Sequence, residues 1–218
     1  MDQGRAKVAK SSNVLKTIDS TYGTICIYPG YVEKIISSNS FFSAIREIHA
    51  NTILHHENII HFRRTHMSIG NHGRPRVHLE MPKYHSDLGE LLLNPGVVLE
   101  QVHVYKFSAD IFAALKCIHE NNLIHCDIKA KNILIQLDPP IAVVTDFGIC
   151  SVDEFMRESS VQTVTYRAPE VDTTREFIQF TSSIDIWSVG CIMLEMIIGR
   201  NLYTSVFSEH SVVFAEQL

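Results

Sequence analysis

The sequence predicts an α+β fold in which a small, β-rich first part precedes a mainly helical second part. Short apolar runs separated by turn residues fill the first part, which is typical of strands. Apolar residues recur at three- and four-residue steps in the second part, which is typical of amphipathic helices. At 218 residues the chain can bury a sizeable core, as one large domain or as two closely packed lobes.

The first part is expected to begin after a polar, disordered tail over residues 1–13. Pro29-Gly30 forms a turn between two of the expected strands, and Ser40 is placed to cap a helix that runs to about Leu54. Pro82 interrupts the strand pattern, so we expect one lobe over about 14–82 and a second over about 83–218. The strands are expected over residues 14–18, 24–28, 31–36, 59–65 and 76–81.

The second part contains two predicted long helices. The first carries an apolar stripe, and the second, over residues 181–199, is so apolar that we expect it to be buried. Between them, residues 133–135 and 142–144 are short enough for a β-hairpin. The stripe of the first helix consists of Val104, Phe107, Ile111, Leu115 and Ile118.

Composition excludes several classes of protein. The net charge of −5 gives no electrostatic support for nucleic-acid binding, and we expect no membrane span, because Glu195 interrupts the most apolar run. The five cysteines form no CxxC pair and are interpreted as reduced thiols, since the N-terminus lacks the apolar core of a secretory signal. The twelve histidines show no metal-ligand spacing and are interpreted as scattered surface and loop residues.

The richest chemistry lies in His125-Cys126-Asp127-Ile128-Lys129-Ala130-Lys131-Asn132, followed by Asp146-Phe147-Gly148. Transfer of a phosphoryl group from a metal-bound nucleotide requires a carboxylate base, a cation near the moving phosphate, and oxygen ligands for magnesium. Taken alone, the first string also fits a capped turn whose Asp and Asn bond only to the backbone. Two further strings follow in order: 168–170 (Ala-Pro-Glu) and 185–190 (Asp-Ile-Trp-Ser-Val-Gly). A chance occurrence of the whole series is therefore very improbable.

This order of motifs resembles the eukaryotic protein kinases, from about Ile18 to the last residue. The resemblance implies a two-lobed kinase fold that uses ATP and Mg²⁺. It makes Asp127 the catalytic base, places Lys129 at the γ-phosphate, and gives Asn132 and Asp146 to the metal. Asp185 resembles the helix-borne carboxylate that accepts hydrogen bonds from N–H groups of the family's catalytic loop. The alternative is that Asp185 is only a carboxylate near a helix N-terminus, stabilised by the helix dipole.

The resemblance also assigns nucleotide-binding residues in the first part. Glu47, in a string like the regulatory helix of cyclin-dependent kinases, is expected to pair with Lys34, although a lone strand lysine is often only a solvated edge residue. Thr21-Tyr22-Gly23 is similar to the end of the glycine-rich phosphate loop, but Gly23 alone keeps a motif position, so we expect weak ATP binding. The gatekeeper beside the hinge is Leu79 or Met81.

The chain departs from the family pattern at Cys126, in the compact segment from Asp146 to Glu170, and at its C-terminal end. Cys126 replaces an arginine that usually meets a phosphate on the activation segment, so we expect activity not to depend on phosphate at Ser159 or Ser160. Cys126 itself is interpreted as a small packing residue rather than a redox sensor. The family's last helices are missing, with the arginine that usually pairs with Glu170, so the chain is either a fragment or a minimal variant.

The resemblance therefore implies a serine/threonine protein kinase, because Lys129 and Thr163 match that class rather than tyrosine kinases. The alternative is a pseudokinase that keeps the fold and transfers little phosphate; a small-molecule kinase is weaker still. The implied partners are a protein substrate with Ser or Thr and an activating partner at the Glu47 helix, with no nucleic acid or membrane. The implied location is intracellular, in cytoplasm or nucleus. The hinge also resembles some herpesvirus kinases, which raises an origin in a large DNA virus.

Overall fold

The computed structural model describes residues 14–20, 22–70, 73–94, 96, 99–152, 155–156, 162–171 and 178–199. These residues form two compact units. The first contains 14–40 and 62–83, and the second contains 41–61 and the described residues from 84 onward. The expected α+β organisation is confirmed, since the first unit is a sheet and the second is mainly helical. The predicted first lobe of 14–82 also includes residues 41–61, which the structure groups with the second unit.

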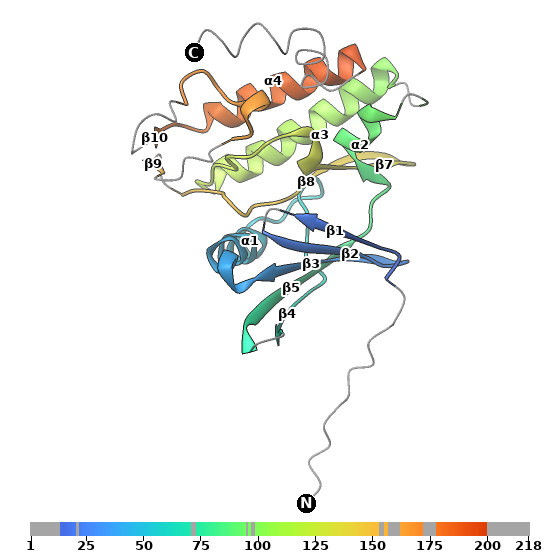
Figure 1. Ribbon diagram of the computed structural model, residues 1–218. Helices are drawn as coiled ribbons and strands as arrows, with labels where there is room; N and C mark the ends of the chain where they lie inside the picture. The colour runs from blue at the N-terminus through green and yellow to red at the C-terminus, as the bar shows by residue number, and fades with distance from the viewer. Residues whose placement is uncertain are drawn as a thin grey trace, which may run out of the picture. The chain divides into compact units, whose positions relative to one another are not determined.

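The first unit is a five-stranded antiparallel sheet with the strand order β1-β2-β3-β5-β4 (Figure 1). Side chains alternate across this sheet. Ile36, Val77 and Leu79 are buried on one face, while Glu33 and His78 lie on the other. The strands are β1 (Lys16–Ser20), β2 (Gly23–Ile27), β3 (Tyr31–Ser37), β4 (Arg64–Ile69) and β5 (Pro75–Pro82).

The hairpin turns follow from local sequence. The Pro29-Gly30 turn is closed by a hydrogen bond from Tyr28 N to Tyr31 O (2.9 Å), and the two tyrosine rings stack at 4.4 Å. Gly23 opens β2 at a point where the backbone of β3 comes very close. A Cβ atom there would lie 1.9 Å from the carbonyl oxygen of Ile35, so only glycine fits.

The predicted strand over residues 59–65 is wrong, because the strand β4 begins only at Arg64. Asn58, Ile59 and Ile60 instead form a loop bound to β8 (Pro140–Val144). Ile60 N donates to Val144 O (2.9 Å), Val144 N donates to Asn58 O (2.8 Å), and Asn58 Nδ2 donates to Ala142 O (2.9 Å). The apolar run is buried by this anchoring rather than by a sheet of the first unit.

The second unit is built around α3 (Gln101–Glu120), which packs on α4 (Ser183–Ile198) and on β8 (Figure 1). A three-stranded sheet, β6-β7-β8, carries the two motif loops at one end. The remaining elements are α1 (Phe41–Ile53), α2 (Leu88–Leu93), β6 (Ser86–Asp87), β7 (Ile133–Leu137), β9 (Phe155–Met156) and β10 (Ile178–Gln179), with the short 3₁₀ segments η1 (Ser38–Ser40, first unit), η3 (Ala130–Asn132) and η4 (Val164–Tyr166).

The predicted apolar stripe of α3 is the core of this unit. Every residue of that stripe is buried, and Phe107 and Ile111 are fully enclosed. The α4 helix was expected to be buried, but only one of its faces is. Ile184, Val189 and Ile192 are enclosed, whereas Trp187 and Ile197 are exposed. Apolar content alone therefore overestimates the burial of α4.

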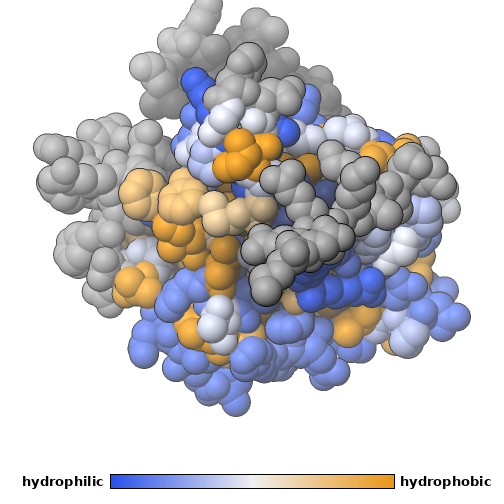
Figure 2. Space-filling view, turned by 90° about the horizontal axis from the view of Figure 1, so that it is seen from below, coloured by the Kyte–Doolittle hydropathy of each residue, from blue (hydrophilic) through white to orange (hydrophobic). Residues whose placement is uncertain are grey.

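Hydrophilic residues cover much of the coloured surface in the view from below, with smaller hydrophobic patches between them (Figure 2). Among the residues that the structure describes, no helix is long and apolar enough to cross a membrane.

Replacement of Phe107 by alanine tests the core. The change leaves a cavity between α3 and its neighbours, and we expect a loss of about 3–5 kcal/mol in the free energy of unfolding. Tyr105→Ala is the matched control on the same helix, because this aromatic side chain is exposed and its loss costs about 0.5 kcal/mol. Denaturant unfolding measures both, and equal losses in the two variants would contradict this core.

Candidate active site

The residues of the first motif string form one hydrogen-bonded loop between α3 and β7. Asn132 Nδ2 donates to the backbone oxygen of Asp127 (2.8 Å) and to its Oδ2 (3.1 Å). Asn132 N also donates to Lys129 O (2.9 Å), which closes the short η3 turn. The five-residue spacing between Asp127 and Asn132 thus folds the loop back on itself and fixes the carboxylate.

Asp127, Lys129 and Thr163 form a closed triangle of side chains. Lys129 Nζ donates to Asp127 Oδ2 (2.6 Å) and to Thr163 Oγ1 (3.1 Å), while Thr163 Oγ1 donates to Asp127 Oδ1 (2.9 Å). Thr163 is 36 residues from Asp127 in the chain. The structure therefore brings together three residues that the sequence assigned to the site separately.

Asp185, in the first turn of α4, holds the backbone of the loop that contains His125 and Cys126. Its two carboxylate oxygens accept the N–H groups of His125 (2.8 Å) and Cys126 (3.0 Å), and His119 Nε2 donates to it as well (2.9 Å). Asp185 is fully buried, and Cys126 takes a left-handed conformation with φ of 67°. These bonds are those expected from the sequence, whereas the partner His119 was not anticipated.

His125 joins the two motif loops. Its Nδ1 accepts the N–H of Asp127 (3.2 Å), so its Nε2 carries the proton and donates to Thr145 O (3.1 Å). The ring also lies 4.8 Å from that of Phe147. His125 is therefore a positioning residue that sets the distance between the Asp127 loop and the Asp146 loop.

The expected metal ligands Asn132 and Asp146 lie on loops that are bonded to each other. Thr145 N donates to Asn132 O (3.0 Å), and Asp146 follows with a left-handed φ of 68°. Because the Asn132 amide nitrogen is used toward Asp127, its oxygen is the atom left for a cation. A carboxylate and an amide oxygen suit Mg²⁺, so these residues fit the predicted metal.

The segment from Gln162 to Glu170 is tied to α4. Gln162 is buried with φ of 60°; its Nε2 donates to Ile184 O and Ser188 Oγ (both 2.8 Å), and its Oε1 accepts from Ala168 N (2.9 Å). Sequence reasoning missed Gln162, because nothing marks it except its place before Thr163. Glu170 is exposed and accepts from Ser183 Oγ (3.2 Å).

A second buried link in this segment joins Tyr166 to Glu195. The tyrosine hydroxyl donates to the carboxylate, at 2.8 and 3.0 Å to its two oxygens. Both residues are buried. Glu195, which in the sequence only interrupted an apolar run, therefore holds the segment from Gln162 to Glu170 onto α4.

Two cysteines beside the loops are enclosed and chemically inert. Burial, with Asp185 nearby, raises the pKa of Cys126 far above its ordinary value, and burial raises that of Cys150 to about 12. Thiolates are the reactive form of cysteine, so neither thiol is a nucleophile at neutral pH. This supports the interpretation of Cys126 as a packing residue. Ser159 and Ser160, the predicted non-essential phosphorylation positions, lie outside the described residues.

The predicted nucleotide residues of the first unit are placed on one face of its sheet. Lys34 is buried opposite Leu79 in the register of β3 and β5, and its Nζ lies 5.8 Å from the centroid of the Tyr22 ring. Met81 lies two pairs further along, opposite Val32, on the same face as Leu79, so the choice of gatekeeper stays open. Thr21 lies outside the described residues.

Glu47 is buried on α1, in the second unit. Lys34 belongs to the first unit, and the Lys34–Glu47 pair therefore stays a prediction. The neighbouring Arg46 donates from Nη1 to the backbone oxygen of Gly148 (3.4 Å), which connects α1 to the loop after Asp146.

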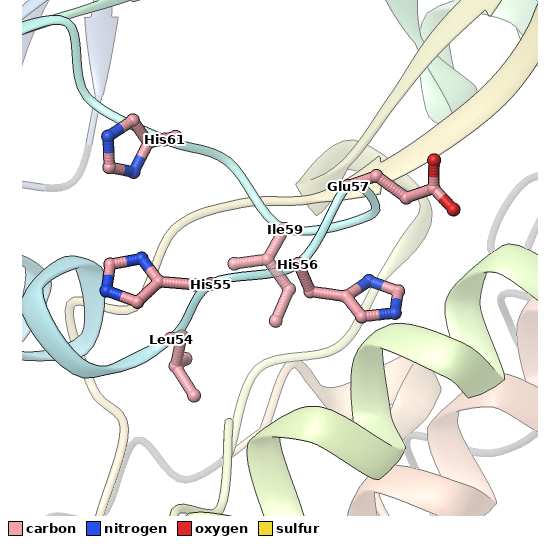
Figure 3. Close-up of a pocket in the computed structure, with 6 residues that line it drawn as sticks. All are labelled: Leu54, His55, His56, Glu57, Ile59 and His61. Atoms are coloured by element: carbon pink, nitrogen blue, oxygen red, sulfur yellow. The ribbon is translucent and has the colours of Figure 1, made fainter.

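A shallow pocket of about 410 Å³ lies on the loop that follows α1. Figure 3 shows His55 and His61 on one side and His56 and Glu57 pointing the other way. The residues of the Asp127 cluster do not line this pocket, and its histidines do not converge on a point. We therefore do not place chemistry there.

Comparison with known families identifies the class of protein. The protein kinase domain model matches residues 10–216 of the 218. The chain therefore belongs to the protein kinase domain family, and the resemblance to the eukaryotic serine/threonine protein kinase superfamily is confirmed.

Mitogen-activated protein kinases are among its relatives. The mitogen-activated protein kinase mpkC of Emericella nidulans is 35% identical over 158 residues, which cover 72% of this chain and 36% of the relative. KSS1 of Saccharomyces cerevisiae is 33% identical over 210 residues, covering 85% and 56%. The mitogen-activated protein kinase 2 of Pneumocystis carinii is 29% identical over 226 residues, covering 96% and 63%. The chain thus spans between 36% and 63% of these relatives.

Asp185→Asn tests the anchor of the catalytic loop. The asparagine NH₂ group would face one of the two backbone N–H groups, so that hydrogen bond would be lost. We expect the free energy of unfolding to fall by about 1–3 kcal/mol. Asp138→Asn, in the exposed turn after β7, is the matched control and should unfold like the parent. Thermal unfolding of both variants measures the effect; parental stability in Asp185→Asn would show that the loop holds its shape without this carboxylate.

Proposed function

We propose that this chain is an active serine/threonine protein kinase that transfers the γ-phosphoryl group of ATP to protein hydroxyl groups. The observation that carries the proposal is the triangle of Asp127, Lys129 and Thr163, with Asn132 bonded to the same carboxylate. A simple capped turn needs no lysine and no distant threonine on that carboxylate. The arrangement supplies a base and a cation at one point.

The chemistry follows from the hydrogen bonds of Asp127. Each carboxylate oxygen has two lone pairs, and the contacts with Lys129, Asn132 and Thr163 leave one available to a substrate hydroxyl. Asp127 takes the hydroxyl proton as the oxygen bonds to the γ-phosphorus, and the bond to the β,γ-bridging oxygen breaks to release ADP. Lys129 stabilises the negative charge on the transferred phosphoryl group.

Asn132 and Asp146 are the residues that hold Mg²⁺ in this proposal. When bound, the ion neutralises charge on the phosphate oxygens. Lys34, Glu47, Gly23, Thr21 and Met81 complete the nucleotide site, as the family resemblance implies. An intracellular location, in cytoplasm or nucleus, belongs to the same proposal.

An activating partner that binds α1 is also part of the proposal. Three apolar side chains are exposed near the start of this helix: Phe41, Phe42 and Ile45, with Phe42 at 77% relative exposure. Exposed aromatic residues of this kind are enriched at protein interfaces. The same helix carries Arg46, which reaches the loop after Asp146.

The pseudokinase remains the second candidate because of the β1–β2 hairpin. Only Thr21 and Tyr22 separate the two strands, and Gly23 is already explained by its close approach to β3. The hairpin therefore contains no glycine reserved for phosphate contact.

Asp127→Asn and Asp146→Asn test the proposed chemistry. We expect phosphate transfer to fall by about 10²–10⁴-fold in Asp127→Asn, because the base is lost. Asp146→Asn should lose transfer and also Mg²⁺-dependent ATP binding, which Asp127→Asn retains. A radiolabelled-ATP assay with basic and acidic protein substrates, followed by phosphoamino-acid analysis, measures rate and residue class.

Asp138→Asn is the control for this assay, since Asp138 is exposed in the β7–β8 turn. Phosphotyrosine as the main product would contradict the serine/threonine assignment. A parent protein no more active than Asp127→Asn, yet able to bind ATP, would establish the pseudokinase instead.

Ser20→Gly tests whether the β1–β2 hairpin limits nucleotide affinity. Ser20 Oγ donates to Gly23 O (3.1 Å), so Ser20→Ala is the matched control that removes this bond without freeing the backbone. We expect Ser20→Gly to bind ATP about 2–5-fold more tightly than Ser20→Ala, because glycine lets the backbone approach the phosphates. Calorimetric titration measures both; equal or weaker affinity in Ser20→Gly would place the phosphate contact elsewhere.

A further inference from the structure

Two histidines and a glutamate meet on the polar face of the first unit's sheet. His66 on β4 is directly opposite His78 on β5. Glu33 on β3 is diagonal to His78, since Ile35 is the residue opposite His78 and Glu33 lies two positions away on the same face. Among the residues that the structure describes, this is the sole group of three or more His, Cys, Asp or Glu residues able to share a cation.

The three side chains are close and already partly ordered. His78 Nδ1 donates to Glu33 Oε1 (3.1 Å), and these side chains are only 13% and 14% exposed. The rings of His66 and His78 stack at 4.4 Å with an interplanar angle of 18°. One potential ligand atom from each residue lies within 4.8 Å of the others.

Two neighbouring hydroxyl groups fix the ligands. Ser68 Oγ lies 2.7 Å from His78 Nε2, the nitrogen that faces away from Glu33. Tyr28 donates its hydroxyl to Glu33 Oε2 (3.4 Å), and burial and the Glu33 charge raise the pKa of Tyr28 to about 12, so it remains a donor. Such outer partners orient histidine and carboxylate ligands in metal sites.

His66 supplies an observation that hydrogen bonding does not explain. Its Nδ1 is buried and has no hydrogen-bond partner among the described residues. A buried polar atom left unpaired is unfavourable, so such an atom calls for a partner. Burial, with His78 nearby, lowers the pKa of His66, which favours the neutral ring.

We propose that Glu33, His66 and His78 bind a Zn²⁺ ion on this face of the sheet. Two imidazole nitrogens and one carboxylate oxygen form a set that favours Zn²⁺ over Mg²⁺. Zn²⁺ binds such ligands at about 2.0–2.2 Å, which places neighbouring ligand atoms about 3.3–3.5 Å apart in a tetrahedron. The ligand atoms, which now lie within 4.8 Å of one another, reach that spacing through side-chain rotation. Water takes the fourth position.

Binding requires one shift of a proton within His78. The ring changes from the Nδ1–H to the Nε2–H tautomer, which frees the Nδ1 lone pair for the metal, and Ser68 changes from donor to acceptor. Arg64 and Glu80, which are paired across β4 and β5, face the same group with opposite charges and oppose each other's effect on it.

The experiment is a Zn²⁺ titration of the chain purified without a histidine tag, using a chromophoric competitor and Mg²⁺ in large excess. We expect one Zn²⁺ per chain, a higher melting temperature with Zn²⁺, and weaker binding as the pH falls and protons compete for His66 and His78. Glu33→Gln and His66→Gln should each weaken binding by more than about tenfold, since even outer-shell changes cost about 10–100-fold. His49→Gln, at an exposed position on α1, is the matched control and should bind like the parent.

Co²⁺ bound in place of Zn²⁺ tests the ligands in the parent protein, without relying on the stability of any variant. The parent should give the visible absorption of tetrahedral Co²⁺ with nitrogen and oxygen ligands, and Zn²⁺ should abolish it. A thiolate-to-cobalt band would instead assign the metal to cysteine. That band, unchanged affinity in Glu33→Gln and His66→Gln, or an absence of Zn²⁺ binding would each overturn the proposal. None of these readouts depends on kinase activity.

Discussion

The loop that carries Asp127, Lys129 and Asn132 depends on one buried carboxylate. Asp185 accepts the N–H groups of His125 and Cys126, and the turn that this requires leaves Cys126 with φ of 67°. A left-handed conformation in a non-glycine residue costs about 1–2 kcal/mol, so it persists only where surrounding bonds fix it. From that turn, His125 reaches back to Thr145 and Asp127 points to Lys129 and Thr163. Removing the carboxylate releases all of these contacts together.

Local patterns predicted much of this arrangement, for reasons that are physical. The stripe of α3 follows from helical periodicity, and the Asp127–Asn132 spacing suits a short turn that closes on its own side chain. The sequence could not show that the apolar run at Ile59 and Ile60 would be buried by β8 rather than by strand pairing. Both outcomes bury the same side chains, and only tertiary contacts distinguish them.

Contacts between residues far apart in the sequence explain why the remaining residues were not predicted. His66 and His78 are 12 positions apart and show no ligand spacing, yet the β4–β5 pairing puts them face to face. Gln162 resembles any polar loop residue until its amide is seen to bond to both α4 and the backbone of Ala168. In each case the informative quantity is which residues oppose one another, and a single sequence does not encode that locally.

The attachment of α1 has a mechanical meaning. The helix and the loop after it bond to other parts of the second unit: Asn58 and Ile60 bond to β8, and Arg46 bonds to Gly148 just past Asp146. These contacts tie α1 and the loop after it both to β8 and to the loop that follows Asp146. A shift of α1 would therefore strain the hydrogen bond between Arg46 and Gly148, and so would act on the loop that follows Asp146.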